Sequence, residues 1–352
     1  MNKLFASMSI GCDEISLVAA RWNRKADYIK EAFSRSEAEG LSRGIVTDAE
    51  KAVRSIQRAV KKLRDKAGKE IHEIYSSVTS EDLEIIPSGG MVLLSRYGRE
   101  VTARDVRRCV GIARAARLPL EKEVLHYYVK GFSIDGNKEI KNPIGLEGIK
   151  LEAKLNIAVV RSSVLRNLSK CISLAGYFPA GYVFSATASS KRVLSPDEIE
   201  EGVTLLDICG DLSEATYFKN GIPEGHKNIT VSGKDLVLRD GSLCGRSVKD
   251  LAGSLRDLAE AAGGNTPKVV VTGEGAMAEG LIEEIENDYE GSVVSGTCFA
   301  GPYEDLPPER AAYIEALGVI DHLREERKKD HLWGGYLRQA FNSALIFLDK
   351  YF

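Results

Sequence analysis

Two stretches of the sequence place an acidic residue at the end of an apolar run and beside a tight turn. In residues 202–221 the first apolar run ends near Asp207, the chain turns at Gly210, and a second apolar-rich run follows. Near the N-terminus, Asp13 lies between two similar runs. Both patterns predict a β-hairpin, whose turn amides can face an anion while the acid holds a metal-bound water. The alternative is two ordinary hairpins whose acids satisfy their own turn amides.

Composition limits the classes of protein that could use such turns. A chain of 352 residues is long enough for two domains, and a net charge of −3 without a basic stripe argues against a nucleic-acid binder. The six cysteines form no C-x-x-C pair, which argues against a zinc site or a disulfide framework. The five histidines are scattered, so histidine-based catalysis has little support.

The sequence also bears on where the protein resides. Its N-terminus has no secretory signal pattern, and no apolar run reaches the roughly 18 residues that a membrane-spanning helix needs. We therefore expect a cytoplasmic protein.

The elements that would position the two turns follow an α/β pattern. After the first hairpin, apolar residues recur every three or four positions in residues 49–66, which predicts a helix, and residues 71–79 predict a strand. The basic face of that helix is expected to be solvated. Residues 247–262 and 310–327 predict further helices, and residues 268–280 predict a strand, a glycine turn and a helix.

Residues 81–160 interrupt this α/β pattern. They predict an extended run at 91–95, a helix at 101–117, and two long strands at 123–134 and 151–160. Thr102 and Asp105 have the spacing of a capping box at the start of the helix. A helix over residues 162–175 then resumes the first domain.

The last 22 residues predict an amphipathic helix. Aromatic and apolar side chains fall on one broad face, and charges at Arg338 and Asp349 exclude a comfortable transmembrane span. Such a helix suits the plane of a membrane surface, with Lys328 and Lys329 favouring anionic lipid. The alternative is a helix docked on its own body or on a second copy. The candidate membrane-binding residues are Trp333, Tyr336, Leu337, Phe341, Leu345, Phe347 and Leu348.

The interrupting segment resembles a known family. Its run Asp135-Gly136, Asn142-Pro143, Gly145, Gly148 and Leu151-Glu152-Ala153 is similar to the small inserted subdomain (1C) of the bacterial cell-division protein FtsA, a member of the actin-like ATPase superfamily. The resemblance implies a duplicated actin-like, ribonuclease H-like α/β fold. Residues 1–84 with 161–199 would form the first actin-like domain, 85–160 the inserted α+β (SHS2-like) subdomain, 200–325 the second actin-like domain, and 326–352 a short linker and amphipathic helix.

The resemblance also implies a nucleotide site, with ATP and Mg²⁺ as cofactors. Its candidate residues are Asp13, Ser16, Asp207, Gly210, Ser213, Gly273 and Gly275. The sequence departs from the family pattern in both phosphate hairpins: Cys209 and Asp211 stand where the second has glycines, and the first lacks its turn glycine and threonine. A carboxylate at Asp211 would repel a triphosphate. We therefore expect weakened or lost nucleotide binding, and no enzyme activity.

The resemblance further implies a membrane-associated scaffold of cell division that self-associates. Its partners would be an FtsZ-like division protein and the inner face of the cytoplasmic membrane at the division site. The subdomain (2B) that carries the FtsZ-binding surface in the family is reduced or missing, because few residues separate Gly221 from the helix at 247–262. Two alternatives stay open: a pilus-assembly adaptor resembling PilM, and an ATP-dependent enzyme of the same superfamily.

Overall fold

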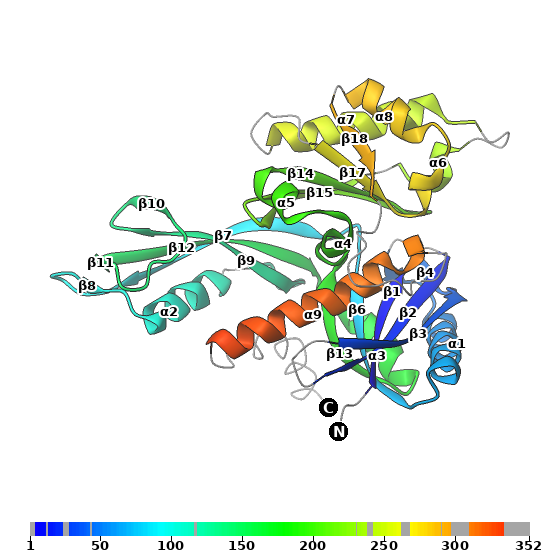
Figure 1. The fold of residues 1–352 in the computed structure, drawn as a ribbon, viewed down its shortest axis with the longest axis horizontal. Helices are drawn as coiled ribbons and strands as arrows, with labels where there is room; N and C mark the ends of the chain where they lie inside the picture. Colours follow the sequence, from blue (N-terminus) through cyan, green and yellow to red (C-terminus); the bar gives the residue numbers. More distant parts are fainter. Residues whose placement is uncertain are drawn as a thin grey trace.

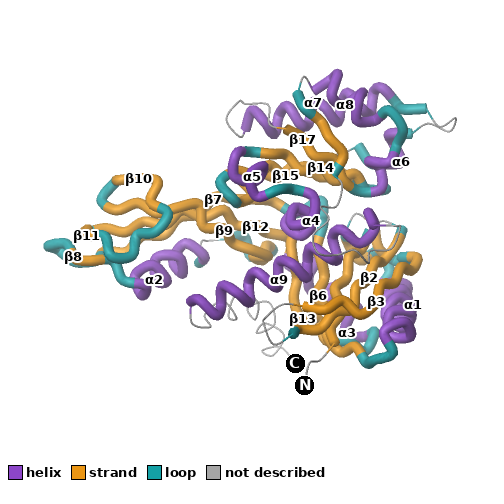
Figure 2. Tube along the Cα trace, in the orientation of Figure 1, coloured by secondary structure: helices purple, strands orange, loops and turns teal. Residues whose placement is uncertain are grey.

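The computed structural model describes most of the 352-residue chain. The described residues are 4–11, 13–23, 28–42, 44–115, 118–229, 231–237, 242–261, 268–289, 291–296 and 310–333. Figures 1 and 2 show two bodies stacked one above the other, with a narrow extension projecting from their side. The predicted C-terminal amphipathic helix lies outside the described residues beyond Trp333.

The lower body is built on a mixed five-stranded sheet, which we call the first sheet. Its order is β13-β6-β1-β2-β3, with β1 and β2 antiparallel, and β6 and β13 parallel to β1. The bounds are β1 Leu4–Ile10, β2 Glu14–Trp22, β3 Tyr28–Glu37, β6 Ile71–Val78 and β13 Phe178–Phe184; the short β4 Leu41–Ser42 and β5 Ile45–Val46 pair with each other.

Helices cover both faces of the first sheet. α1 (Ala49–Ala67) and α3 (Ser162–Leu174) share one apolar cluster with it, and α9 (Ile314–Trp333) shares the other. α4 (Ser185–Val193) lies beside α9 (Figure 1). In α1 the side chain of Asp48 caps the first turn, Ile56 and Leu63 are fully buried, and Gly68 ends the helix in the left-handed conformation. The structure thus matches the periodicity of residues 49–66 closely.

The upper body repeats the same topology in the second sheet, whose order is β16-β15-β14-β17-β18. β14, β15 and β16 form an antiparallel meander, and β17 and β18 follow in parallel, as β6 and β13 do in the first sheet. This repeat agrees with the prediction of duplicated α/β domains. The strand bounds are β14 Val203–Ile208, β15 Ser213–Lys219, β16 Ile222–Ile229, β17 Lys268–Thr272 and β18 Val293–Ser295; the helices are α5 Pro196–Glu201, α6 Gly233–Leu236, α7 Gly245–Ala261, η1 Glu274–Met277 and α8 Leu281–Tyr289. The short η2 (Arg310–Tyr313) precedes α9 and packs on the first sheet.

The chain between β16 and α7 is short. Its described residues form α6 and one β-bridge between Val237 and Leu243. Residues 238–241 of this connection lie outside the described residues. α6 buries Leu236 in the apolar cluster beneath the second sheet, so this connection is anchored to the upper body.

The extension is the segment that interrupts the α/β pattern, and we call it the insert. Its sheet has the order β10-β9-β12-β7, with α2 packed on one face. β7 begins seven residues before the predicted extended run because its pairing with β12 continues to Glu84. The bounds are β7 Glu84–Leu93, β8 Arg99–Glu100, α2 Ala103–Arg114, β9 Lys122–Ile134, β10 Asn137–Ile140, β11 Glu147–Gly148 and β12 Lys150–Arg161.

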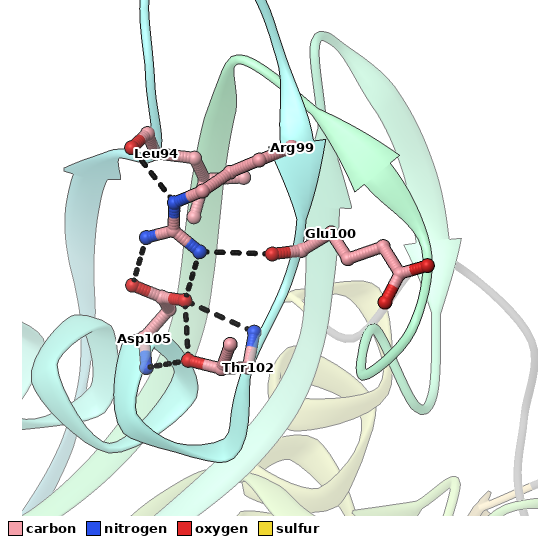
Figure 3. Close-up of polar contacts among 5 residues, drawn as sticks. All are labelled: Leu94, Arg99, Glu100, Thr102 and Asp105. Atoms are coloured by element: carbon pink, nitrogen blue, oxygen red, sulfur yellow. Dashed lines mark hydrogen bonds and ion pairs between the residues drawn. The ribbon is translucent and has the colours of Figure 1, made fainter.

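The start of α2 is fixed by a capping box and a two-pronged ion pair (Figure 3). Asp105 accepts from the backbone N–H of Thr102 at 3.0 Å, and both of its oxygens accept from Arg99 at 2.6 and 2.7 Å. The Arg99 guanidinium and the Thr102 donors hold the pKa of Asp105 well below its usual range. The sequence indicated the Thr102–Asp105 box, whereas the ion pair between Asp105 and Arg99 of β8 comes from the structure.

The insert contacts the upper body through polar groups. Asn156 on β12 donates to the carbonyl of Pro223 at 2.9 Å, and Lys130 on β9 pairs with Glu224 at 2.5 Å. Both acceptors belong to β16, so the insert, which interrupts the first body in the chain, also contacts the second sheet.

Gly318 is expected to be essential for the contact between α9 and α4. A Cβ there would lie 1.9 Å from the carbonyl oxygen of Ala188, a distance that forces the helices apart. We expect Gly318→Ala to lower the free energy of unfolding by about 2 kcal/mol or more in urea denaturation. The matched control is Gly111→Ala on α2, where a Cβ would meet open space, and it should raise stability by up to about 1 kcal/mol. Equal effects of the two substitutions would contradict this packing.

Candidate functional site

The two predicted turns lie at the cleft between the two bodies. A small cavity between them is lined from the first sheet and its helices by Ile10, Gly11, Gly44, Thr79, Ser185 and Glu315, and from the second sheet by Asp207, Cys209, Leu212 and Glu214. Its volume is about 20 Å³, which is room for roughly one water molecule. Pockets for nucleotide-sized ligands measure roughly 300–1,000 Å³. This cavity is therefore much smaller than a nucleotide-sized pocket.

The first turn closes on itself. The backbone N–H of Gly11 donates to the carbonyl of Glu14 at 2.9 Å, so this amide is already used within the turn. Asp13 is exposed at the mouth of the cleft, with a side chain 65% exposed. Ser16 is buried within β2 and is not among the residues that line the cavity. The structure thus places Asp13, exposed, at the mouth of the cleft beside Lys234, and Ser16, buried, in β2 opposite Ser9.

The second turn has the predicted hairpin geometry. The N–H of Cys209 donates to the carbonyl of Leu212 at 3.1 Å, and β14 pairs with β15 in register from Val203 to Ile208. Asp207 is buried at the end of β14 and lines the cavity. Ser213 is also fully buried. Its side chain lies on the face of β15 opposite to that of Glu214, because successive side chains of a strand point to opposite faces of the sheet. Of the candidates in this hairpin, Asp207 therefore faces the cavity and Ser213 does not.

The glycines of the third candidate stretch have a packing role. Gly273 has φ +89°, and a Cβ there would lie 2.4 Å from Asp207 Oδ1. At Gly275 a Cβ would lie 2.2 Å from Cγ2 of Ile208. Both residues let the turn after β17 lie directly against the end of β14, and neither lines the cavity. Close approach of two backbone segments explains these glycines without any ligand.

Glu214 and Glu315 are cavity residues that sequence reasoning left out of the candidate site. Glu214, only 4% exposed, accepts hydrogen bonds from Thr79 Oγ1 at 2.6 Å and from Ser185 Oγ at 2.5 Å. Glu315 on α9 accepts from Ser9 Oγ at 2.5 Å. Burial raises the pKa of both carboxyls, and the charge of Glu214 adds to the rise at Glu315. An acid within the apolar strand of residues 213–219 was the signal available for Glu214.

Lys234 is a further residue at the mouth of the cleft. Its ammonium lies 2.7 Å from Asp211 Oδ1 in the second turn and 3.4 Å from Asp13 Oδ2 in the first. The hydrogen bond to Asp211 is the main cause that raises the pKa of Lys234, with Asp13 adding to it. Asp211, which sequence reasoning treated as a source of repulsion, thus has an internal counter-ion. Nothing in the sequence indicated that α6 would return to this turn.

The described residues bear only in part on the predictions about membrane binding and metal binding. Within the described residues no helix combines the length and apolarity that crossing a bilayer requires. The predicted membrane-binding side chains from Trp333 to Leu348 lie outside the described residues. Over the same described ranges, no group of three or more histidine, cysteine, aspartate or glutamate side chains is arranged to hold a metal ion.

Comparison with known proteins places this geometry in a family context. Residues 80–159, which contain the insert, match the family model described as the SHS2 domain inserted in FtsA. The cell-division protein FtsA of Pseudomonas aeruginosa is 27% identical over 319 residues, covering 87% of this chain and 76% of the relative. The chain is similar to FtsA. It spans about half the length of other curated FtsA proteins: 54% of the one from Borreliella burgdorferi, at 29% identity, and 46% of the one from Escherichia coli K12, at 31% identity.

Solved structures support the actin-like fold of this FtsA-like chain. A PilM-PilN type IV pilus biogenesis complex contains a chain that superposes with a TM-score of 0.61 at 15% identity, covering 91% of this chain and 98% of that one. MreB5 of Spiroplasma citri bound to ADP gives a TM-score of 0.50 at 10% identity, covering 95% and 99%. At these identities the likeness concerns the fold alone. The predicted fold class, a duplicated actin-like α/β architecture with an inserted subdomain, is confirmed.

The buried Glu214 carboxyl makes stability depend on pH. Its pKa is raised in the folded protein, so the folded state binds more protons than the unfolded state, and stability falls as pH rises from the unfolded value of about 4.3 through the folded one. Glu214→Gln removes the charge, and the Thr79 and Ser185 hydroxyls can accept from its amide. We expect this variant to be more stable than the parent at pH 8 by on the order of 1 kcal/mol in urea denaturation, with the difference vanishing below pH ~4.

The control for this prediction is Glu283→Gln, which changes an exposed carboxylate on α8. It should follow the parent protein at every pH. A Glu214→Gln variant that is less stable than the parent at pH 8 would show that the buried carboxylate is favourable as an anion, against the argument from burial.

Proposed function

We propose that this protein is an actin-like scaffold of bacterial cell division that acts on the inner face of the cytoplasmic membrane. The observation that carries the proposal is the insert: its match to the SHS2 domain of FtsA falls on a discrete sheet-and-helix unit inserted between β6 and α3 of the first body. The role in cell division comes from the FtsA relatives, two of which this chain covers to 76% and 54% of their length. The division-site location and the scaffold role are what the resemblance to that family implies. Self-association would involve the α/β bodies and the insert.

The proposal includes weakened or lost nucleotide binding. It is supported by the cavity of about 20 Å³, by the packing role of Gly273 and Gly275, and by Lys234 at the mouth of the cleft. ATP and Mg²⁺ remain the cofactors to test, because the related fold of MreB5 is bound to ADP. An ATP-dependent enzyme would need the cleft to open and its turn amides to be released.

An FtsZ-like division protein is the proposed partner. The described connection from β16 to α7 holds only α6 and one β-bridge, in the place where the FtsA resemblance implies the FtsZ-binding subdomain. If that partner is bound, another surface must supply the contact. The alternative role is a pilus-assembly adaptor. The PilM-PilN structure is only 15% identical, so its match concerns the fold and fits this role less well than the FtsA relatives fit the division role. The two roles differ in whether the C-terminal segment binds a membrane.

Vesicle flotation tests the membrane part of the proposal. The full-length protein should float with vesicles of phosphatidylethanolamine and phosphatidylglycerol, because the apolar face of the predicted helix inserts between headgroups. Replacing Phe341 and Phe347 together with alanine should lower the bound fraction by about tenfold or more. The matched control replaces Gln339 and Asn342, on the polar face, with alanine and should bind like the parent.

Two results would contradict the proposal. Full-length protein that remains at the bottom of the gradient, or a Phe341/Phe347 variant that floats as well as the parent, would remove the membrane scaffold and favour the adaptor role. Filaments of an FtsZ-like protein added to the vesicles should float only when the full-length protein is present, and filaments that stay behind would remove that partner.

A further inference from the structure

The carboxylates of the two turns meet at one internal ammonium group. Asp13 belongs to the turn between β1 and β2, and Asp211 belongs to the turn between β14 and β15. Lys234 Nζ is 2.7 Å from Asp211 and 3.4 Å from Asp13, so a single side chain joins the first body to the second. Without a cation between them, two carboxylates held this near each other would repel.

The backbone holds Lys234 in place. The N–H of Gly233 donates to the carbonyl of Cys209 at 2.7 Å, and the N–H of Lys234 donates to the carbonyl of Gly210 at 3.3 Å. Gly233 eases this approach, because a Cβ there would lie 3.0 Å from the carbonyl oxygen of Cys209, which is a tight contact. Ser232 and Asp235 cap α6 reciprocally, with the Ser232 N–H donating to Asp235 at 2.9 Å. α6 therefore packs on the second turn, and the Lys234 side chain reaches Asp13 on the other side of the cleft.

A second contact across the cleft lies deeper. Glu214 on β15 accepts from Thr79, which follows β6 in the first body, and from Ser185 at the start of α4. Between this buried contact and the Lys234 contact at the mouth, the cavity has room for about one water. The two bodies therefore contact each other at two places in the cleft: through Lys234 at its mouth and through Glu214 in its interior.

We propose that Lys234 is an internal counter-ion that closes the cleft between the two bodies, in place of a bound nucleotide or metal ion. Its ammonium neutralises one carboxylate from each turn, and α6 satisfies the carbonyls of the second turn. The closed arrangement is then the resting state of the protein without ligand. This inference depends on the geometry of the cleft and stands whether or not the protein acts in cell division.

The size of the expected effect follows from exposure. The side chains of Lys234 and Asp13 are 57% and 65% exposed, and that of Asp211 is 26% exposed. Exposed ion pairs are screened by water, so removing the ammonium should shift the opening equilibrium of the cleft by only about fivefold. Hydrogen exchange resolves a change of this size when it is read from backbone amides that open with the cleft.

The test is hydrogen exchange with mass spectrometry on the full-length protein without nucleotide, lipid or partner. The readout is the peptide around Thr79, whose hydroxyl contacts Glu214 across the cleft. Lys234→Ala should speed its exchange by about fivefold. Asp13→Asn, which leaves Lys234 paired with Asp211 inside the upper body, should have an effect in the same direction.

The matched control is Lys227→Ala, which removes an ion pair of the same 2.7 Å length to Asp257 within the upper body. It should leave exchange around Thr79 unchanged. The proposal is overturned if Lys234→Ala exchanges around Thr79 at the same rate as Lys227→Ala. Because vesicles are absent, a failure here is separate from a failure of the flotation test.

Discussion

The arrangement of the whole molecule depends on the contact between the two bodies. Phe184 of the first sheet shares a buried apolar cluster with Leu205 and Phe218 of the second sheet. At the cleft, Glu214 accepts hydrogen bonds from Thr79 and Ser185. A carboxylate that is 4% exposed must find partners or become protonated, and here both hydroxyl partners belong to the side of the cleft opposite its own strand. Separating the bodies would remove both hydrogen-bond donors from the Glu214 carboxylate. Burial of one acid therefore ties β15 to the end of β6 and to the start of α4, and it sets how closely the two hairpin turns approach.

Closure of the cleft explains several residues that otherwise look unrelated. Gly273 and Gly275 are small so that the turn after β17 can lie against Asp207 and Ile208. Gly233 is small so that α6 can reach Cys209, which brings Lys234 to the two turn acids. Each of these residues could be assigned to a ligand from its type alone. In the structure, contacts within the chain account for them.

The local sequence pattern predicted most helices and strands well, because their formation depends on residues that are close in the sequence. The three- to four-residue apolar spacing in α1 gave its bounds to within one residue, and the Thr102–Asp105 spacing gave the start of α2. The second hairpin was predicted from its glycines and apolar runs. β7 was predicted too short, since residues 84–90 become a strand only through pairing with β12 residues that are 63 or more positions away in the chain.

The site was less predictable because it depends on contacts between distant segments. Asp13 and Asp207 were expected at the cleft and lie there, while Ser16 and Ser213 were inferred from position in a motif, are buried, and do not line the cavity. Glu315 comes from a helix more than 300 residues after Ser9, its hydrogen-bond donor. Lys234 lies in a four-residue helix with no periodic signal. Only the packing of α6 on the second turn reveals that its charge meets Asp211.

Calorimetric titration of the full-length protein with ATP and Mg²⁺ tests the central claim, a cleft closed by the chain's own groups, most directly. The account predicts no measurable binding up to about millimolar ATP, because a cavity of about 20 Å³ and an internal ammonium leave no place for the triphosphate. A dissociation constant in the micromolar range would contradict it, and would show that the two bodies separate readily to admit a nucleotide between Asp13 and Asp207.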